Sequence, residues 1–279
     1  MPYIIVPVYT RESDDFERLK NNFISILSQG FPVQFVLQDK KDRAIKILDE
    51  LDANYMFSND FKHMHISPKI NNQITGIMHL PKDTDIIVFI DADVYLLPDS
   101  VKNLIQPIKD GKYKICTGKR IIDNKYILKA WSFVYEAMNI GIYGGLFAVE
   151  YKWFMEKAFE DFSNHYADDW SVYLSAISTK TKIHHCDSFA FCSQDNIDRF
   201  LVRQYCWMKK YSKRRFYSCM FLETISIPFG PLKSLYIYYK TKCIGSSLAA
   251  LFLSIIIVWI QIKVIFKKSI NWSGFQVKI

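Results

Sequence analysis

Two aspartates, Asp91 and Asp93, directly follow five apolar residues in the segment IIVFIDADV, residues 86–94. An apolar run of this length predicts a buried strand, and side chains two positions apart on a strand point to the same side. Neighbouring carboxylates repel each other unless a positive charge lies between them, and Mg²⁺ and Mn²⁺ prefer such oxygen ligands. The spacing therefore predicts a divalent metal site that also binds phosphate, although Asp is common in any loop after a strand.

Further polar segments carry residues that could take part in chemistry. Asp168 and Asp169 precede an apolar-periodic stretch, where they could serve in chemistry or simply stabilise the start of a helix. Gly144 and Gly145 stand before an apolar run, which indicates either a close approach of the backbone or an ordinary turn. The His-His-Cys-Asp run at residues 184–187 is a poor zinc site, because adjacent strand residues point to opposite sides.

Alternating strands and helices are expected to position these residues. The periodicity of apolar residues predicts strands at 3–8, 33–37 and 86–90 and helices at 14–27, 44–51 and 100–108. Such alternation is typical of an α/β fold with a Rossmann-like, mostly parallel sheet and flanking helices. Ligands of these sheets bind beyond the carboxyl ends of the strands, where QDKKD at 38–42 and DAD at 91–93 both stand.

Composition indicates a membrane partner for the C-terminal part. The 279 residues include 36 Lys and Arg and 28 Asp and Glu, a net charge of +8, and six cysteines without the Cys-x-x-Cys spacing of a zinc finger. Residues 199–217 interleave aromatic and basic side chains, as in helices on anionic membranes or on nucleic acid. Residues 243–262 carry no charge and would span about 30 Å as one helix. No recognition motif supports nucleic acid, so we expect a membrane.

Several motifs resemble those of the ceramide glucosyltransferase family, inverting nucleotide-sugar glycosyltransferases with a GT-A fold. The similar segments are QDKKDRAI at 38–45, SPKINNQITG at 67–76, DADV at 91–94 and ADDW at 167–170. The family's closing motif, (Gln/Arg)-x-x-Arg-Trp, corresponds to RQYCW, in which Arg203 and Trp207 fit and Cys206 replaces the second Arg. Arg199 or Lys209 could compensate for that loss of charge.

The resemblance implies a role for each matching residue. The donor-binding residues would be Asp39, Asp42, Lys69, Asp91 and Arg203. The acceptor side would include Gly144, Gly145 and Trp207. Asp93 would hold Mn²⁺ or Mg²⁺ against the diphosphate of a donor that the resemblance implies to be UDP-linked, and Asp169 would be the catalytic base.

The implied activity is the transfer of a glucose-type hexose to a lipid hydroxyl, at a membrane and with the catalytic domain facing the cytoplasm. The expected domains are a GT-A catalytic domain at 1–198, an interfacial and re-entrant region at 199–242, a transmembrane helix at 243–262 and a short basic tail at 263–279. The alternatives are a polyprenyl-phosphate glycosyltransferase, a nucleotide-sugar-binding membrane protein impaired by Cys206, and a nucleotidyltransferase.

Overall fold

The computed structural model describes residues 1–10, 15–59, 67–137, 141–193, 196–272 and 275–278. The strands are β1 (Pro2–Val8), β2 (Val33–Leu37), β3 (Tyr55–Phe57), β4 (Ile86–Ile90), β5 (Tyr95–Leu96), β6 (Ile115–Ile122), β7 (Leu146–Glu150), β8 (Ile183–Cys192), β9 (Ser269–Trp272) and β10 (Phe275–Lys278). The helices are α1 (Phe16–Leu27), α2 (Ala44–Glu50), α3 (Pro68–Met78), α4 (Ser100–Lys109), α5 (Tyr126–Ala137), α6 (Tyr151–Lys157), α7 (Phe159–Ser163), α8 (Asp168–Ser178), α9 (Ile197–Tyr211), α10 (Lys213–Ile225), the 3-10 helix η1 (Ile227–Phe229), α11 (Gly230–Thr241), α12 (Ile244–Leu251) and α13 (Leu253–Phe266).

The chain divides into two compact units. The first unit comprises Met1–Arg120 and Gly141–Phe191, and the second comprises Ile121–Ile140 and Cys192–Ile279. All six elements predicted from periodicity are present, and their ends differ from the prediction by at most two residues. Asp14, the predicted start of the first helix, lies outside the described residues.

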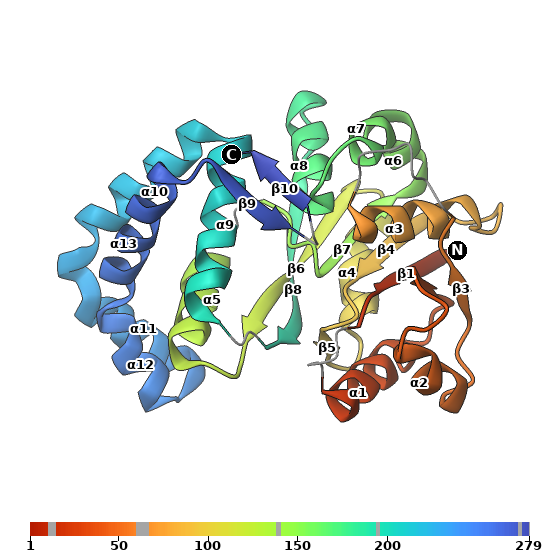
Figure 1. Cartoon of the computed structure of the whole chain (residues 1–279), viewed down its shortest axis with the longest axis horizontal. Coiled ribbons are helices and arrows are strands. Elements are labelled where there is room, and N and C mark those ends of the chain that lie inside the picture. The colour runs from red at the N-terminus through yellow and green to blue at the C-terminus, as the bar shows by residue number, and fades with distance from the viewer. Residues whose placement is uncertain (11–14, 60–66, 138–140, 194–195, 273–274, 279) are drawn as a thin grey trace. The chain divides into compact units, whose positions relative to one another are not determined.

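An eight-stranded sheet with the order β3-β2-β1-β4-β7-β6-β8-β5 forms the centre of the first unit (Figure 1). Parallel pairs join β3 to β2, β2 to β1 and β1 to β4. In contrast, β7 runs antiparallel to β4 and β6, and β5 runs antiparallel to β8. The prediction of a mostly parallel sheet is therefore correct for the first four strands and wrong for the rest. The intervening helix between β6 and β7, α5, belongs to the second unit, so these strands lack the helical crossover that parallel pairing requires.

The start of α3 is fixed by its own sequence. The Ser67 hydroxyl accepts a hydrogen bond from the Ile70 N–H, and Pro68 occupies the first turn, where its missing N–H costs no helical hydrogen bond. The helix packs against β1 and β2. This packing holds α3 beside the carboxyl ends of the parallel strands.

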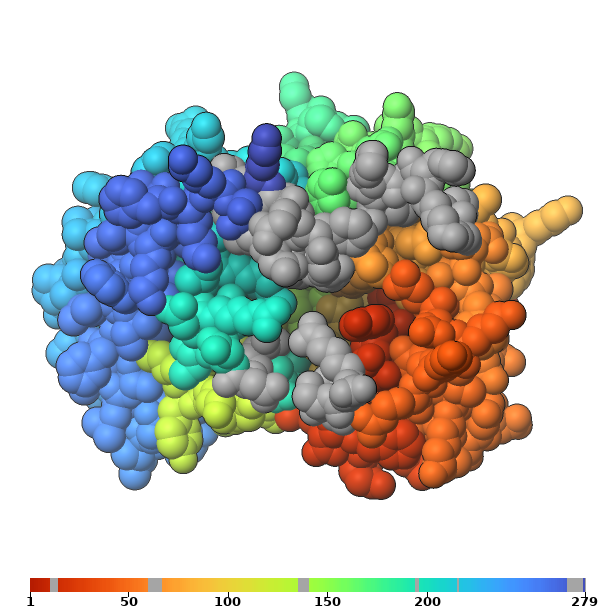
Figure 2. Space-filling view, in the orientation of Figure 1, coloured from red at the N-terminus to blue at the C-terminus, as the bar shows by residue number. Residues whose placement is uncertain are grey.

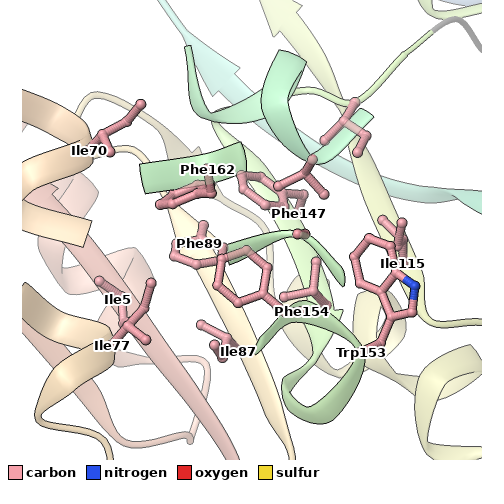
Figure 3. Packing of buried hydrophobic residues seen from close by; sticks show 14 of the residues in the cluster. Ile5, Ile70, Ile77, Ile87, Phe89, Ile115, Phe147, Trp153, Phe154 and Phe162 are labelled. Atoms are coloured by element: carbon pink, nitrogen blue, oxygen red, sulfur yellow. The ribbon is translucent and has the colours of Figure 1, made fainter. Parts of the chain in front are cut away.

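Aromatic side chains fill the core between the sheet and the helices that follow β7 (Figure 3). The Phe89 ring on β4 stacks on Phe147 of β7, with 4.8 Å between the ring centroids. It also contacts Phe154 of α6 and Phe162 of α7, at 5.8 and 5.7 Å. All four rings are fully buried, and Val172 of α8 belongs to the same core. The core thereby holds α8 on the sheet.

The second unit contains α5, α9 to α13 and the antiparallel pair β9–β10. Helix α13 packs against α9 and α10, and α12 packs against α5 and α11. Residues 199–217, predicted as one helix, are divided between α9 and α10 because Ser212 has an extended backbone, with φ −151° and ψ 80°.

The single helix predicted for residues 243–262 is instead the pair α12 and α13, which is bent by 56°. Phe252 interrupts the helix between them, with φ −101° and ψ 0°. Within the described residues, no individual helix has the length and apolar composition needed to cross a membrane, whereas this bent pair meets both criteria when its two helices are taken together.

Candidate active site

One ammonium group joins two carboxylates beyond the carboxyl end of β4. Lys69 Nζ on α3 lies 2.6 Å from Asp91 Oδ1 and 2.8 Å from Asp168 Oδ2. It also donates a hydrogen bond of 3.2 Å to the main-chain oxygen of Gly144. Burial by itself would lower the pKa of Lys69, but Asp168 and Asp91 raise it above its ordinary value, so the group stays charged. Four segments that are distant in the sequence thus meet at one cation.

The two aspartates of DAD lie in a turn rather than on the strand. β4 ends at Ile90, so the alternation of side chains along a strand does not extend to Asp93, contrary to the prediction. Asp91 is partly buried against Lys69, whereas Asp93 is exposed. Burial raises the pKa of Asp91, Lys69 opposes this rise, and the charge of Asp93 adds to it. The two carboxylates therefore interact, although they face different surroundings.

The chemistry of this pair fits a divalent cation that is shared with a ligand. Within the described residues, no group of three or more His, Cys, Asp or Glu side chains could hold a metal ion by itself. Mg²⁺ at phosphate sites commonly takes one or two protein carboxylates and completes its coordination with phosphate and water. The exposed Asp93, with Asp91 two residues before it, can supply these protein carboxylates.

Asp169 has the properties of a base. Burial, and then the charge of Asp168, raise its pKa from 3.8 to about 6, while Lys69 and Arg120 oppose the rise. Its Oδ1 accepts a hydrogen bond of 2.8 Å from the N–H of Trp170. A carboxyl group with this pKa is ionised at pH 7 and can accept a proton from a hydroxyl group.

The two glycines before β7 allow the close approach that the sequence indicated. A Cβ atom added to Gly144 would lie 3.2 Å from both Asp168 Oδ1 and Asp169 Cβ. A Cβ atom added to Gly145 would clash with the Tyr143 side chain. The Gly145 carbonyl also accepts a hydrogen bond of 3.1 Å from the Asp91 N–H. Gly144 and Gly145 therefore lie against both acidic segments.

Asp42 belongs to a second hydrogen-bonded cluster, beyond the ends of β1 and β2. Its Oδ2 accepts the Thr10 N–H at 3.0 Å, and its Oδ1 accepts the Thr10 hydroxyl at 2.5 Å and the Ala44 N–H at 2.9 Å. Asp39 is exposed and accepts the Lys41 N–H at 2.8 Å. The two predicted donor residues thus lie in the segment after β2, where parallel sheets bind ligands.

Sequence reasoning missed two buried amides on α3. Asn72 Nδ2 donates to Val8 O at 3.1 Å and to Val36 O at 2.9 Å, which ties together the ends of β1 and β2. Gln73 Nε2 donates to Asp168 Oδ2 at 2.8 Å. Both side chains are buried. The available signal was the Asn-Asn-Gln run inside an otherwise apolar helix.

Arg203, Cys206 and Trp207 lie on α9 of the second unit. Cys206 is fully buried and burial raises its pKa to about 11, so a neutral thiol stands where the motif has an Arg. Lys209 does not offer a free replacement charge, because its Nζ donates to three main-chain oxygens at the end of α13, at 2.9 to 3.1 Å. Arg199 is exposed. The roles predicted for Arg203 and Trp207 stay predictions.

Comparison with known proteins relates this arrangement to one family. The family model "Glycosyl transferase family 2" matches residues 3–146. The mannosyltransferase of Pyrobaculum calidifontis, solved with GDP-Man and Mn²⁺, has a TM-score of 0.59 at 12% identity and covers 95% of this chain and 87% of its own. Glucosyl-3-phosphoglycerate synthase of Mycobacterium tuberculosis, solved with Mn²⁺ and UDP-Glc, has a TM-score of 0.54 at 12% identity, covering 75% and 78%. No curated protein matches the chain. The structural likeness shows that the fold is shared.

Proposed function

The chain belongs to glycosyl transferase family 2, whose model covers residues 3–146, and we propose that it moves a hexose from a nucleotide-diphosphate sugar to a lipid hydroxyl. The observation that carries this proposal is the cluster around Lys69. There, Asp91 at the end of a sheet strand and Asp168 beside the candidate base Asp169 meet through one ammonium group. Such an arrangement provides for a donor and a proton acceptor within one site.

The donor is proposed to be UDP-linked and to bind over the ends of β1, β2 and β4. Asp39 and Asp42 would contact the uracil and ribose, and Asp91 and Lys69 would complete the donor side. Two relatives in fold were solved with UDP-Glc or GDP-Man and Mn²⁺, which supports a nucleotide sugar and a divalent metal. Asp93 would hold Mn²⁺ or Mg²⁺, which neutralises the charge that develops on the departing diphosphate. Arg203 would add a second cation on the donor side.

Asp169 is proposed to take the proton of the acceptor hydroxyl during attack at the anomeric carbon, which gives inversion. Its pKa of about 6 is still below 7, so the carboxyl is ionised at pH 7, and the raised value makes it a better proton acceptor than an ordinary Asp. Gly144 lies directly against this carboxylate, because a Cβ atom added to Gly144 would lie 3.2 Å from the Asp169 Cγ. Gly144 and Gly145 would form part of the acceptor side. Trp207 would contribute to the acceptor side.

The acceptor is proposed to be a lipid because of the surface of α10 to α13, which is drawn from cyan to blue in Figure 2. Among the described residues 213–266, seventeen large apolar side chains are exposed and six are buried. Leu235, Tyr239, Ile244 and Phe266 are 66 to 79% exposed. Apolar patches of this extent mark interaction surfaces.

The interior of the same helices contains a bonded polar cluster next to buried apolar side chains. Lys233 Nζ lies 3.0 Å from Glu223 Oε2 and 2.9 Å from Ser226 Oγ, and it also donates to Ser254 Oγ. These polar groups are partly or fully buried. Polar groups that bond to one another inside, with apolar groups outside, suit a lipid environment. Because nucleotide sugars are cytosolic, the catalytic unit would face the cytoplasm.

The test is product identification. Membranes that contain the protein are incubated with labelled UDP- and GDP-linked sugars, lipids are extracted, and labelled products are identified by mass. Asp169→Asn is the inactive control and Asp52→Asn, an exposed aspartate after α2, is the matched active control. A labelled lipid stable to mild acid supports the proposal, and an acid-labile lipid phosphate identifies a polyprenyl-phosphate glycosyltransferase. Donor binding without transfer to any lipid would refute the activity and support an impaired binding protein.

Membrane attachment is tested separately by vesicle flotation. Deleting residues 243–279 would remove α12 and α13, which pack on α5, α9, α10 and α11. Because that deletion would disturb the fold of the second unit, point variants are used instead. Leu235→Gln with Ile244→Gln should weaken binding at least tenfold, because burying one such side chain contributes about 1.5–3 kcal/mol. Ile24→Gln, an exposed site on α1, should have no effect. Raising the salt concentration should weaken binding to anionic vesicles, since each basic residue contributes about 1 kcal/mol. Equal flotation of all variants would contradict the lipid surface.

A further inference from the structure

Asp168, the neighbour of the proposed base, is more deeply buried than Asp169. Its side chain is buried, and its Oδ2 receives two donors: Lys69 Nζ at 2.8 Å and Gln73 Nε2 at 2.8 Å. On its other side, Oδ1 lies against Gly144. A carboxylate that is buried and held in this way is poorly placed to collect a proton from a substrate.

The contacts of Asp168 show that it is not the cap of its helix. α8 begins at Asp168, and the cap position before it is held by Ala167, which makes no side-chain hydrogen bond. The Asp168 carboxylate instead bonds to side chains of α3. It therefore fastens the first turn of α8 to α3, and Asp169 is the next residue in that turn.

The two donors come from one rigid face of α3. Lys69 and Gln73 are four residues apart in a helix, so their side chains lie on the same face. Gln73 is fully buried, and its Oε1 has no hydrogen-bond partner among the described residues. The bond from this buried amide to the buried Asp168 carboxylate holds both groups in place, because either one left unpaired would be costly.

We propose that Gln73 and Asp168 are positioning residues, which with Lys69 fix the start of α8 so that the Asp169 carboxylate is presented to the acceptor hydroxyl. This inference rests on the proposed function, because it assumes that Asp169 is the base. Lys69 forms ion pairs with both Asp91 and Asp168, so it also fixes the position of the base relative to the proposed donor-binding residues. A displacement of about 1 Å at a catalytic group can cost 10²-fold in rate.

The test is Gln73→Met, which removes the amide donor while keeping the length of the side chain and the charge of the site. Its matched control is Gln29→Met, at a second buried glutamine, which donates to Ser25 O and Leu97 O and accepts the Val101 N–H. Both variants should be less stable. With UDP-glucose as donor and lipid-containing membranes as acceptor, Gln73→Met should lower kcat tenfold to a hundredfold and leave the affinity for UDP with Mn²⁺ within twofold. Gln29→Met should keep both values once corrected for the folded fraction.

A second readout does not depend on catalysis. Hydrogen exchange of the first-turn amides of α8 should be faster in Gln73→Met and unchanged in Gln29→Met. Unchanged kcat in folded Gln73→Met, or unchanged exchange in α8, would overturn the positioning role. If the wild type transfers no sugar from any donor, the proposed function fails, and the exchange comparison alone decides whether Gln73 holds α8.

Discussion

Replacement of Asp169 by Asn separates a catalytic carboxylate from a structural one. The Asn side chain has the same size, and its oxygen can still accept the Trp170 N–H that Asp169 Oδ1 accepts at 2.8 Å. It cannot accept a proton from the substrate. We expect Asp169→Asn to bind donor normally and to lose at least about 10²-fold in kcat, the low end of what a general base contributes.

The pKa of Asp169 sets the expected pH dependence. In the wild type, kcat/KM should fall about tenfold per pH unit below a midpoint near pH 6, because the protonated carboxyl cannot act as a base. The residual activity of Asp169→Asn should lack this acidic limb. Asp168→Glu keeps the negative charge next to Asp169, but its extra methylene beside Gly144 should shift the base. It should lower kcat less than Asp169→Asn does and keep the acidic limb.

The same pKa predicts a change in stability with a defined sign. A carboxyl whose pKa is raised by folding destabilises the native state when ionised, so the cost is absent below pH 3.8, grows toward pH 6 and is complete above it. A rise from 3.8 to about 6 corresponds to at most about 3 kcal/mol. Asp169→Asn should therefore raise the free energy of unfolding at pH 7, and the gain should vanish near pH 4.

Rate and stability together decide the assignment. Denaturant unfolding at pH 7 and pH 4 measures the stability difference, and transfer of labelled sugar measures the rate, with Asp52→Asn as control for the mutation itself. Near-normal transfer by Asp169→Asn, or an acidic limb that is absent from folded Asp168→Glu, would refute Asp169 as the base. A loss of stability in Asp169→Asn at pH 7 would refute the account of its pKa.

Two further substitutions test the metal site and the glycine contact. Asp93→Ala should remove most activity and, with it, the dependence of transfer on added Mn²⁺ or Mg²⁺. Its melting temperature should be unchanged, because the side chain is exposed. Full turnover of this variant in excess chelator would exclude the metal role. Gly144→Ala should lower kcat at least tenfold, because the added methyl group would lie 3.2 Å from Asp168 Oδ1 and Asp169 Cβ. Gly111→Ala is the control, because a methyl group added there meets no other atom, so only stability should change. Equal kcat in the two glycine variants would show that the contact at Gly144 has no catalytic consequence.

Local patterns predicted the parallel half of the sheet, because each strand and helix there is a contiguous run with its own periodicity. They did not predict the antiparallel half. The direction of β7 depends on the chain leaving the sheet after β6 and returning from α5 in the other unit, which no local pattern encodes. The break between α12 and α13 at Phe252 was also not predicted, because a run of uncharged, mostly apolar residues does not indicate where the helix bends.

The candidate site was predictable where residues follow a strand and hidden where their role depends on a distant partner. Asp91 and the pair Asp168 and Asp169 were singled out from their positions beside apolar segments, whereas the choice of Asp169 as the base came from the family resemblance. Gln73 and Asn72 looked like ordinary helix residues, because their partners, Asp168 and the ends of β1 and β2, are brought to them only by packing. Asp168 was correctly placed near a helix start, but its partner is α3 rather than the end of its own helix.

The charges around Lys69 explain why a divalent cation suits this site. Four carboxylates interact there, those of Asp91, Asp93, Asp168 and Asp169. The cations in this set are Lys69 and Arg120. Burial, and then the neighbouring carboxylates, raise the pKa of Asp91 and Asp169. When all these groups are ionised, the four carboxylates exceed the two cations by two charges, which equals the charge of one Mg²⁺ or Mn²⁺. A nucleotide diphosphate alone would increase the repulsion, so donor and metal should bind cooperatively. Without metal, UDP should therefore bind weakly to the wild type, and Asp93→Ala should reduce this difference.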